Sequence, residues 1–319
     1  MQGWKEKLLS QADKEIMIKA VIQSILAYSM SVFKLPRCLC KDIEAMIQKF
    51  WWDQGEARKI HWVKWSTLCT SKLVGGMGFK DFQMFNSALL AKHEKDSLVY
   101  KVFQAKFFPG GSIFDAVIPS RCSHAWRSIL QARDVILKGV VWRVGDGRSI
   151  NIWEQKWVPN LITSKVVSPR SNSHVIWVSE LFLPNSKLWD VELLNAIFYL
   201  WEAEEISRIH VSPHCQIDAY VWLFTSNGDY SVKSAYKMLA TKAMASAQAY
   251  SLIDNSEKVW KGVWRIRTPN KIRHFMWRAV KDSLPTIENL HKRQIPLDKS
   301  CSLCEEYQET NMHVLWLCD

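Results

Sequence analysis

The stretch CSLCEEYQETNMHVLWLC, residues 301–318, determines the fold that we predict for the last part of the chain. It places Cys301, Cys304, His313 and Cys318 in the spacing C-x2-C-x8-H-x4-C. Two residues between the first two cysteines let one tight turn aim both sulfur atoms at a single ion, and three thiolates with one imidazole suit tetrahedral zinc. Four protein ligands leave no open coordination position, so the sequence predicts a structural Zn2+ that folds the end of the chain.

The alternative is that the Cys-x2-Cys pair arose by chance among eight cysteines and that His313 is an ordinary histidine. The four residues fall within 18 positions, whereas the other five cysteines have no comparable His or Cys neighbours. We expect these five to be buried thiols: Cys38, Cys40, Cys69, Cys122 and Cys215.

A basic segment precedes the cysteine cluster. Between Lys258 and Arg293 there are ten Lys and Arg residues against two acidic residues. Pro269 is placed to open a helix, in which the following apolar residues recur at helical spacing and predict a core-facing side: Ile272, Phe275, Met276, Ala279 and Val280.

The other side of this helix is cationic and contains a tryptophan. Such a stripe suits phosphate contacts and base stacking, so it predicts binding of RNA or DNA through Lys271, Arg273, His274, Trp277, Arg278 and Lys281. The alternatives are a solvated helix face without a ligand and, for Trp277, a place in the core.

The composition fits this interpretation. The chain has 319 residues, 48% of them hydrophobic, and its 42 Lys and Arg against 31 Asp and Glu give a net charge of +11, which favours polyanionic partners. The N-terminus resembles neither a secretory signal nor a transit peptide, and the longest apolar stretch, 21–33, is shorter than a membrane span. We therefore expect an intracellular protein of the nucleus or cytoplasm, not secreted, with no membrane partner.

The rest of the chain mixes helices and short strands. Residues 5–50 show a helical apolar stripe through Ile18, Val21 and Ile25, broken at Pro36. Segments 140–144 and 150–153 flank Gly145-Asp146-Gly147 and predict a β-hairpin. Ser231 is placed to cap a helix, and residues 240–249 form a linker or weak helix.

At this point the chain resembles the reverse transcriptase zinc-binding domain of plant LINE-type (non-LTR) retrotransposons, and the region that follows the polymerase palm in those elements. The motifs that carry the resemblance are Phe33-x-Leu35-Pro36, Phe50-Trp51-Trp52, Gly75-Gly76-Met77-Gly78-Phe79, Phe85-Asn86, Gly147 with Trp153 and Trp157, Tyr230-Ser231-Val232-Lys233-Ser234, Trp260-x3-Trp264, Phe275-x-Trp277-Arg278-Ala279, Leu284-Pro285-Thr286, Asn289-Leu290 and the Cys/His set.

The resemblance implies a role related to RNA-directed DNA synthesis, but three departures separate this chain from a complete polymerase. The palm would precede residue 1, and no Asp-Asp dipeptide occurs to hold the two metal ions of phosphoryl transfer. A Trp-Arg-Leu-containing stretch of the family is missing after His93, and the chain stops one residue after Cys318.

We therefore predict an α+β fold with a helical N-terminal region (1–100), a mixed strand and helix middle (101–250) and a small C-terminal zinc-binding module (255–319). The predicted function is a non-catalytic, zinc-binding, nucleic-acid-binding remnant of a reverse transcriptase. A zinc-stabilised module that binds a protein partner is the alternative, and salt-dependent RNA binding separates the two.

Overall fold

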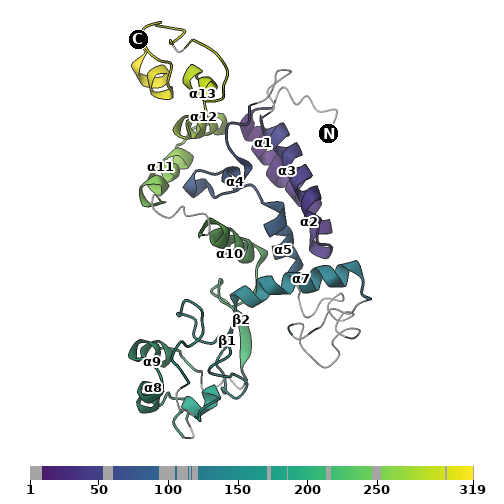
Figure 1. Ribbon diagram of the computed structural model, residues 1–319, viewed down its shortest axis with the longest axis vertical. Helices are drawn as coiled ribbons and strands as arrows, with labels where there is room; N and C mark the ends of the chain where they lie inside the picture. Colours follow the sequence, from purple (N-terminus) through teal and green to yellow (C-terminus); the bar gives the residue numbers. More distant parts are fainter. Residues whose placement is uncertain are drawn as a thin grey trace. The chain divides into compact units, whose positions relative to one another are not determined.

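The computed structural model describes residues 9–52, 60–92, 105, 114, 116, 121–170, 174–184, 186–212, 217–245, 253–298 and 300–318. The protein is α+β, as predicted: helices predominate, and the described residues form one two-stranded sheet (Figure 1). It divides into two compact units, which we call unit 1 (Met1–Asn86 with Ala240–Asp319) and unit 2 (Ser87–Leu239). The first and last segments of the sequence thus fold together.

Unit 1 is helical. Its elements are α1 (Gln11–Met17), the π-turn η2 (Ile18–Ile22), α2 (Gln23–Val32), α3 (Arg37–Trp52), α4 (Trp65–Leu68), η3 (Lys72–Val74), the start of α5 (Phe82–Leu90), the end of α10 (Val232–Ala245), α11 (Ile253–Arg265), α12 (Asn270–Val280), α13 (Ile287–His291) and the π-turn η5 (His313–Leu317). Ser10 and Asp13 form a capping box that starts α1, and Pro269 directly precedes α12, as predicted. Helix α1 packs against α3 and α12, and α11 packs against η3 and α12.

The N-terminal apolar stripe is buried only in part. Ile18 has no exposed surface, but 39% of Val21 and 67% of Ile25 is exposed. The predicted helical stripe is therefore not buried along its whole length. The physical reason is the π-turn η2, which adds a residue to one helical turn and rotates the later side chains away from the face that Ile18 shares.

Aromatic residues from distant segments fill the core of unit 1. Trp51 meets Phe79 edge-on with ring centroids 5.1 Å apart, and Trp65 stacks on Phe79 at 5.5 Å. Phe79 reaches this position through a glycine turn, in which Gly75 has a φ of +82° and ends η3.

Asn86 fixes the end of α2. Its amide nitrogen donates to the carbonyl oxygens of Met30 and Phe33 at 2.7 and 2.8 Å, and its amide oxygen accepts from the backbone N–H of Leu35 at 2.8 Å. These bonds satisfy carbonyls that the end of a helix leaves free, immediately before Pro36.

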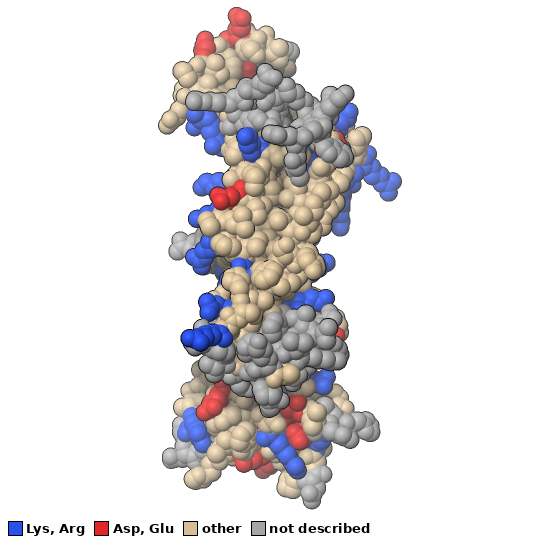
Figure 2. Space-filling view, turned by 90° about the vertical axis from the view of Figure 1, so that its right-hand side faces the viewer, with Lys and Arg blue, Asp and Glu red and all other residues tan. Residues whose placement is uncertain are grey.

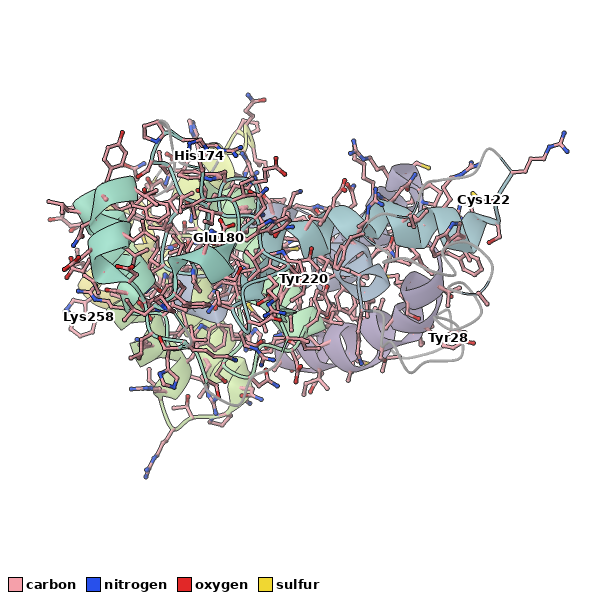
Figure 3. All side chains as sticks on the ribbon, turned by 90° about the horizontal axis from the view of Figure 1, so that it is seen from below. Tyr28, Cys122, His174, Glu180, Tyr220 and Lys258 are labelled. Carbon is pink, nitrogen blue, oxygen red and sulfur yellow. The ribbon has the colours of Figure 1, made fainter. Side chains whose placement is uncertain are left out.

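The continuous helix Gln11–Val32 is long and apolar enough, by length and composition alone, to cross a membrane. This helix is longer than the apolar stretch 21–33, which by itself is too short for a membrane span. The absence of a membrane partner therefore stays a prediction. The helix also carries charged side chains that form ion pairs within the protein, because Glu15 pairs with Lys19 and Lys72. Its outer side holds Tyr28, which is 82% exposed and labelled in Figure 3, and the surface around these helices in Figure 2 is mostly tan.

Unit 2 holds the sheet. Its elements are the end of α5, α7 (His124–Gly139), β1 (Val140–Arg143), η4 (Val178–Leu181), α8 (Val191–Ile197), α9 (Leu200–Ser207), β2 (Ala219–Trp222) and most of α10. Strand β1 pairs antiparallel with β2, in the register Val140 with Trp222 and Arg143 with Ala219. The ring centroids of Tyr220, on β2, and Trp142, on β1, are 3.9 Å apart, and Tyr220 is labelled in Figure 3.

The predicted hairpin of 140–144 with 150–153 is wrong, because β1 pairs with β2 instead. The carboxylate of Asp218, just before β2, accepts backbone N–H bonds from Gly145, Gly147 and Ser149 at 2.8, 2.9 and 2.9 Å. A long-range partner therefore satisfies the donors that a hairpin would have paired locally.

Two larger cores and a smaller one around Trp126, Ile129 and Leu130 stabilise the described part of unit 2. One of the larger cores surrounds Trp157, Ile150 and Leu181, and beside it the buried carboxylate of Glu202 accepts N–H bonds from Val167 and Ser168. The other is formed by α5, α7, β2 and α10, in the residues Ala88, Leu90, Ala91, Ala132, Val135, Trp222, Ala235 and Met238.

The predicted N-cap is confirmed, because Ser231 Oγ accepts from Ser234 N at 3.1 Å where α10 begins. Helix α10 continues to Ala245, so the start of the predicted linker is helical. His93, Cys215 and residues 246–249 lie outside the described residues.

Candidate metal centre and basic helices

Four side chains at the end of unit 1 bring their ligand atoms together. One ligand atom from each of Cys301, Cys304, His313 and Cys318 lies within 4.8 Å of all the others. The sulfur atoms of Cys301 and Cys318 are 3.8 Å apart, and the sulfur of Cys304 is 3.2 Å from His313 Nε2. Two thiolates about 2.3 Å from one tetrahedral zinc ion stand about 3.8 Å apart, so the donor set fits this ion.

The backbone positions these side chains. A bridge between Ser300 and Gln308 and the bond from Cys301 N to Tyr307 O at 2.7 Å close the loop that carries both cysteines. Glu305 completes the turn at a φ of +61°. Thr310 Oγ1 accepts from His313 N at 3.0 Å, and Cys318 N donates to His313 O at 2.8 Å, so one short π-turn presents the second pair.

The electrostatics of the cluster favour one thiolate in particular. Backbone hydrogen bonds from Tyr307 and Glu306 lower the pKa of Cys304 to about 7. Desolvation and the neighbouring cysteines raise the pKa of Cys318 to about 11. A cation among these sulfurs would favour the charged form of both, and thiolates are the form that binds metals.

The other cysteines differ from the expectation of burial. Cys40 is buried, Cys69 and Cys122 are half-buried, and Cys38 is exposed. Cys38 directly follows the first residue of α3, on a turn that faces solvent, so its position and not its chemistry decides its exposure.

Three residues that the sequence argument missed connect the cysteine cluster to the basic helices. Glu309 accepts from Ile287 N at 3.1 Å through one oxygen and from Ser302 Oγ at 3.2 Å through the other. Asn289 donates to Leu284 O at 3.1 Å, and Asn311 donates to Ala279 O of α12 at 3.3 Å. Asn311 lies just before η5, where a short polar side chain is a typical cap signal, whereas Asn289 lies inside α13 and no local pattern marks it.

Helix α12 faces the opposite way from the prediction. The predicted core residues Ile272, Phe275 and Val280 are 40%, 48% and 47% exposed, whereas Trp277 has no exposed surface and His274 only 3%. The cause lies in partners from the N-terminal segment. Glu15 Oε2 lies 2.9 Å from His274 Nε2, and Gly75 O accepts the indole N–H of Trp277 at 3.0 Å.

The six residues predicted to bind nucleic acid therefore have different surroundings. Lys271 is exposed, and Arg273 is half-buried with its Nε donating to Thr268 O at 3.1 Å. Arg278 donates to Ser283 O, and Lys281 lies over the ring of Trp260; burial lowers the pKa of both side chains. Trp277 and His274 have almost no surface to offer a base, so the stacking role predicted for Trp277 is corrected to a core role.

Four basic residues of α11, α12 and the loop between them are exposed: Lys258, Arg265, Arg267 and Lys271. No salt bridge of these four is found within the described part of the chain. Lys258 lies in the middle of α11 and Arg265 at its end, Arg267 lies in the following loop, and Lys271 is the second residue of α12.

Comparison with known proteins places this arrangement in a class. The family model described as zinc-binding in reverse transcriptase matches residues 230–319, which include the Cys/His cluster and both basic helices. The class defined by the fold and the cluster is thus the reverse transcriptase zinc-binding domain.

Two curated relatives from Arabidopsis thaliana extend the match. A protein named "Putative ribonuclease H protein" is 31% identical over 333 aligned residues, covering 100% of this chain and 52% of the relative, so the chain spans about half of that protein's length. An uncharacterized mitochondrial protein is 38% identical over 139 residues, 41% of this chain and 90% of the relative. The chain belongs to the family of plant LINE-type (non-LTR) retrotransposon reverse transcriptases, in the region that includes the zinc-binding domain.

Proposed function

We propose that this protein is a non-catalytic, zinc-binding nucleic-acid-binding protein of the reverse transcriptase family. In this proposal a zinc ion held by Cys301, Cys304, His313 and Cys318 folds the C-terminal module, and exposed cations of α11 and α12 contact the phosphates of RNA or DNA. The observation that carries it is the convergence of the four ligand atoms within 4.8 Å beside these basic helices.

The metal is zinc on chemical grounds. Three sulfur donors and one imidazole within 4.8 Å of one another select a borderline-soft ion, and Mg2+ or Ca2+ would require oxygen ligands. With four protein ligands the ion has no free position for substrate, so its role is to fold residues 301–318 and, through Glu309 and Asn311, to hold them against α12 and α13.

The nucleic-acid surface consists of Lys258, Arg265, Arg267 and Lys271, which replace the buried members of the predicted set. Cations without an acidic partner gain most from phosphate, because no existing ion pair has to be broken. The family relationship supports the same partner.

The non-catalytic role is supported by the distribution of the acidic residues, which form no metal-binding cluster among the described residues. Polymerase and ribonuclease H chemistry both require clustered carboxylates that hold two divalent ions. Over the described ranges the Cys/His set is the sole group of three or more potential metal ligands.

The alternative, a protein-interaction module, is favoured by one observation. Trp316 is 83% exposed, Met312 66% and Leu317 62%, so the C-terminal module presents a cluster of apolar side chains. Exposed apolar patches of this kind mark interaction surfaces.

Fluorescence anisotropy with a labelled single-stranded RNA, and with DNA of the same sequence, tests the nucleic-acid proposal on the full chain. The log of the binding constant should fall linearly with log salt between about 50 and 200 mM, with a slope of about −0.7 per phosphate contact. The combined variant Lys258→Gln, Arg265→Gln, Arg267→Gln, Lys271→Gln should weaken binding and flatten this slope.

The control removes four exposed cations around α3 instead, in Lys34→Gln, Arg37→Gln, Lys41→Gln and Lys49→Gln. It changes the net charge equally, and it should lower affinity less. Equal effects of the two variants would show that net charge alone drives binding, and no binding at about 50 mM salt would move the choice to the protein-interaction alternative.

Two further assays complete the test. Elemental analysis should find one zinc per chain, lost in Cys304→Ser and retained in Cys38→Ser, which alters an exposed cysteine outside the cluster. Primer extension and cleavage of RNA–DNA hybrids should be absent with Mg2+ or Mn2+. Activity that copurifies with the chain through successive columns would contradict the non-catalytic role.

A further inference from the structure

Unit 1 contains a pocket apart from the metal centre. It has a cavity volume of about 290 Å³ and lies where α1, η2, η3, α11 and the first turn of α12 meet. Its lining includes Glu15, Lys19, Lys72, Trp264, Arg273 and His274. Ligand pockets begin near 300 Å³, so this one suits a small group and not a large organic molecule.

Cations dominate the pocket. Lys19 and Lys72 reach the same Glu15 oxygen at 2.6 and 2.7 Å, and His274 lies 2.9 Å from the other oxygen. Burial alone would raise the pKa of Glu15, but the hydrogen bonds from His274, Lys19 and Lys72 outweigh it and lower the pKa to about 2. The carboxylate is therefore charged at neutral pH, and it balances one of three permanent cations when Arg273 is included.

The cations crowd one another. Burial lowers the pKa of Lys72; the hydrogen bond and charge of Glu15 oppose this shift, and the charges of Lys19 and Arg273 add to it. The Lys72 ammonium is held 4.0 Å from the centroid of the Trp264 ring, so it cannot easily swing into solvent. An anion in the pocket would relieve this repulsion.

Several polar atoms in the wall have no partner among the described residues. The donor Trp264 Nε1 and the ring nitrogen Nδ1 of His274 are buried without a hydrogen bond to any described residue. Arg273 uses its Nε for Thr268 O, and within the described ranges its terminal nitrogens have no acceptor. Buried polar groups are normally satisfied, so unsatisfied groups around a cavity point to a ligand or water that they bind.

We propose that this pocket binds a phosphate monoester, through Arg273 and Lys72 with Lys19 beside them. A guanidinium and two ammonium groups match the charge and the several acceptor oxygens of such an anion. The phosphate has two sources with the same chemistry: the 5′ end of a nucleic-acid strand or a free nucleotide. Only the first source rests on the function proposed above.

The test compares two labelled single strands of one sequence on the full chain, one with a 5′-phosphate and the other with a 5′-hydroxyl. The 5′-phosphorylated strand should bind about tenfold more tightly or better, the effect of one charge-assisted interaction. In parallel, isothermal titration calorimetry measures binding of inorganic phosphate and of AMP without any oligonucleotide.

Variants assign the effect to the pocket. Arg273→Gln should bring the ratio of the two affinities to about one, whereas Lys271→Gln, on the same helix outside the pocket, should weaken both strands and keep the ratio. Glu15→Gln should strengthen phosphate binding, because it removes the competing carboxylate. This opposite sign cannot arise from partial unfolding, and thermal melts verify that each variant is folded.

The outcomes separate this pocket from the function proposed above. A preference for the 5′-phosphate that Arg273→Gln abolishes supports a nucleic-acid end as the ligand. Equal affinity of both strands with calorimetric binding of AMP or phosphate, lost in Arg273→Gln, supports a free nucleotide. The pocket proposal is overturned if no phosphate preference and no phosphate or AMP binding is found, whether or not the strands themselves bind.

Discussion

The indole N–H of Trp277 donates to the carbonyl oxygen of Gly75 at 3.0 Å, across 202 positions of sequence. Gly75 holds this carbonyl in place through a left-handed backbone, and a Cβ at this residue would lie 2.6 Å from the ring of Trp260. The contact therefore requires glycine at one end and a buried tryptophan at the other. It joins the N-terminal and C-terminal segments of unit 1 and fixes which face of α12 is exposed.

Trp277→Ala should lower the free energy of unfolding by about 3–5 kcal/mol, because it deletes a fully buried aromatic side chain. Trp277→Phe should cost less, since it keeps a ring but leaves the Gly75 carbonyl without its donor. Urea unfolding measures both. The control is Trp316→Ala, at a tryptophan that is 83% exposed, which should change stability by less than about 0.5 kcal/mol. A Trp277→Ala protein with wild-type stability and weakened RNA binding would restore the stacking role.

Acid should weaken unit 1 through Glu15. Its pKa is lowered from 4.5 to about 2, so the carboxylate contributes stability that is full above pH 4.5 and is lost as the pH falls toward 2. The difference in unfolding free energy between wild type and Glu15→Gln should therefore shrink across this interval. Glu204→Gln, at an exposed ion pair with Arg208, should show no such trend. A constant difference between wild type and Glu15→Gln would contradict the lowered pKa.

Asp218 should be a principal determinant of unit 2 stability. Asp218→Ala leaves three backbone N–H groups of the Gly145–Ser149 loop without their acceptor and should cost about 1–3 kcal/mol. Asp218→Asn should recover part of this loss, because it keeps one carbonyl oxygen. Asp146→Ala, which removes a single bond to Arg148 N at 3.2 Å, is the control in the same loop. Thermal melts that rank Asp146→Ala as the more harmful change would contradict this assignment.

Chelation should unfold the C-terminal module without unfolding unit 2. The amides of Cys301 and Glu305 donate within the cysteine loop, so removal of the metal should speed their hydrogen exchange. The amides of Val178 and Ile152 in unit 2 should keep their protection. Added zinc should restore the slow exchange of the loop, and exchange that ignores chelator would show that the loop folds without metal.

Local chemistry explains what the sequence determined. The Cys/His spacing, the proline before α12, the Ser231 cap and the glycine turn at Gly75 act within a few residues, so they were readable without a partner. The α+β class and the reverse transcriptase family followed from the same local motifs. The Cys/His cluster was readable because two short turns bring its members together.

Only the tertiary structure decided which distant residues pack against each helix and strand. The hairpin at Gly145 failed because Asp218, far along the chain, satisfies its donors. The side of α12 that carries His274 and Trp277 turned inward because Glu15 Oε2 lies 2.9 Å from His274 Nε2 and the carbonyl oxygen of Gly75 accepts the indole N–H of Trp277. Amphipathic spacing indicates that a helix has two different faces. When one face is apolar and the other carries a tryptophan and a histidine, the residues that pack against the helix decide which face is buried.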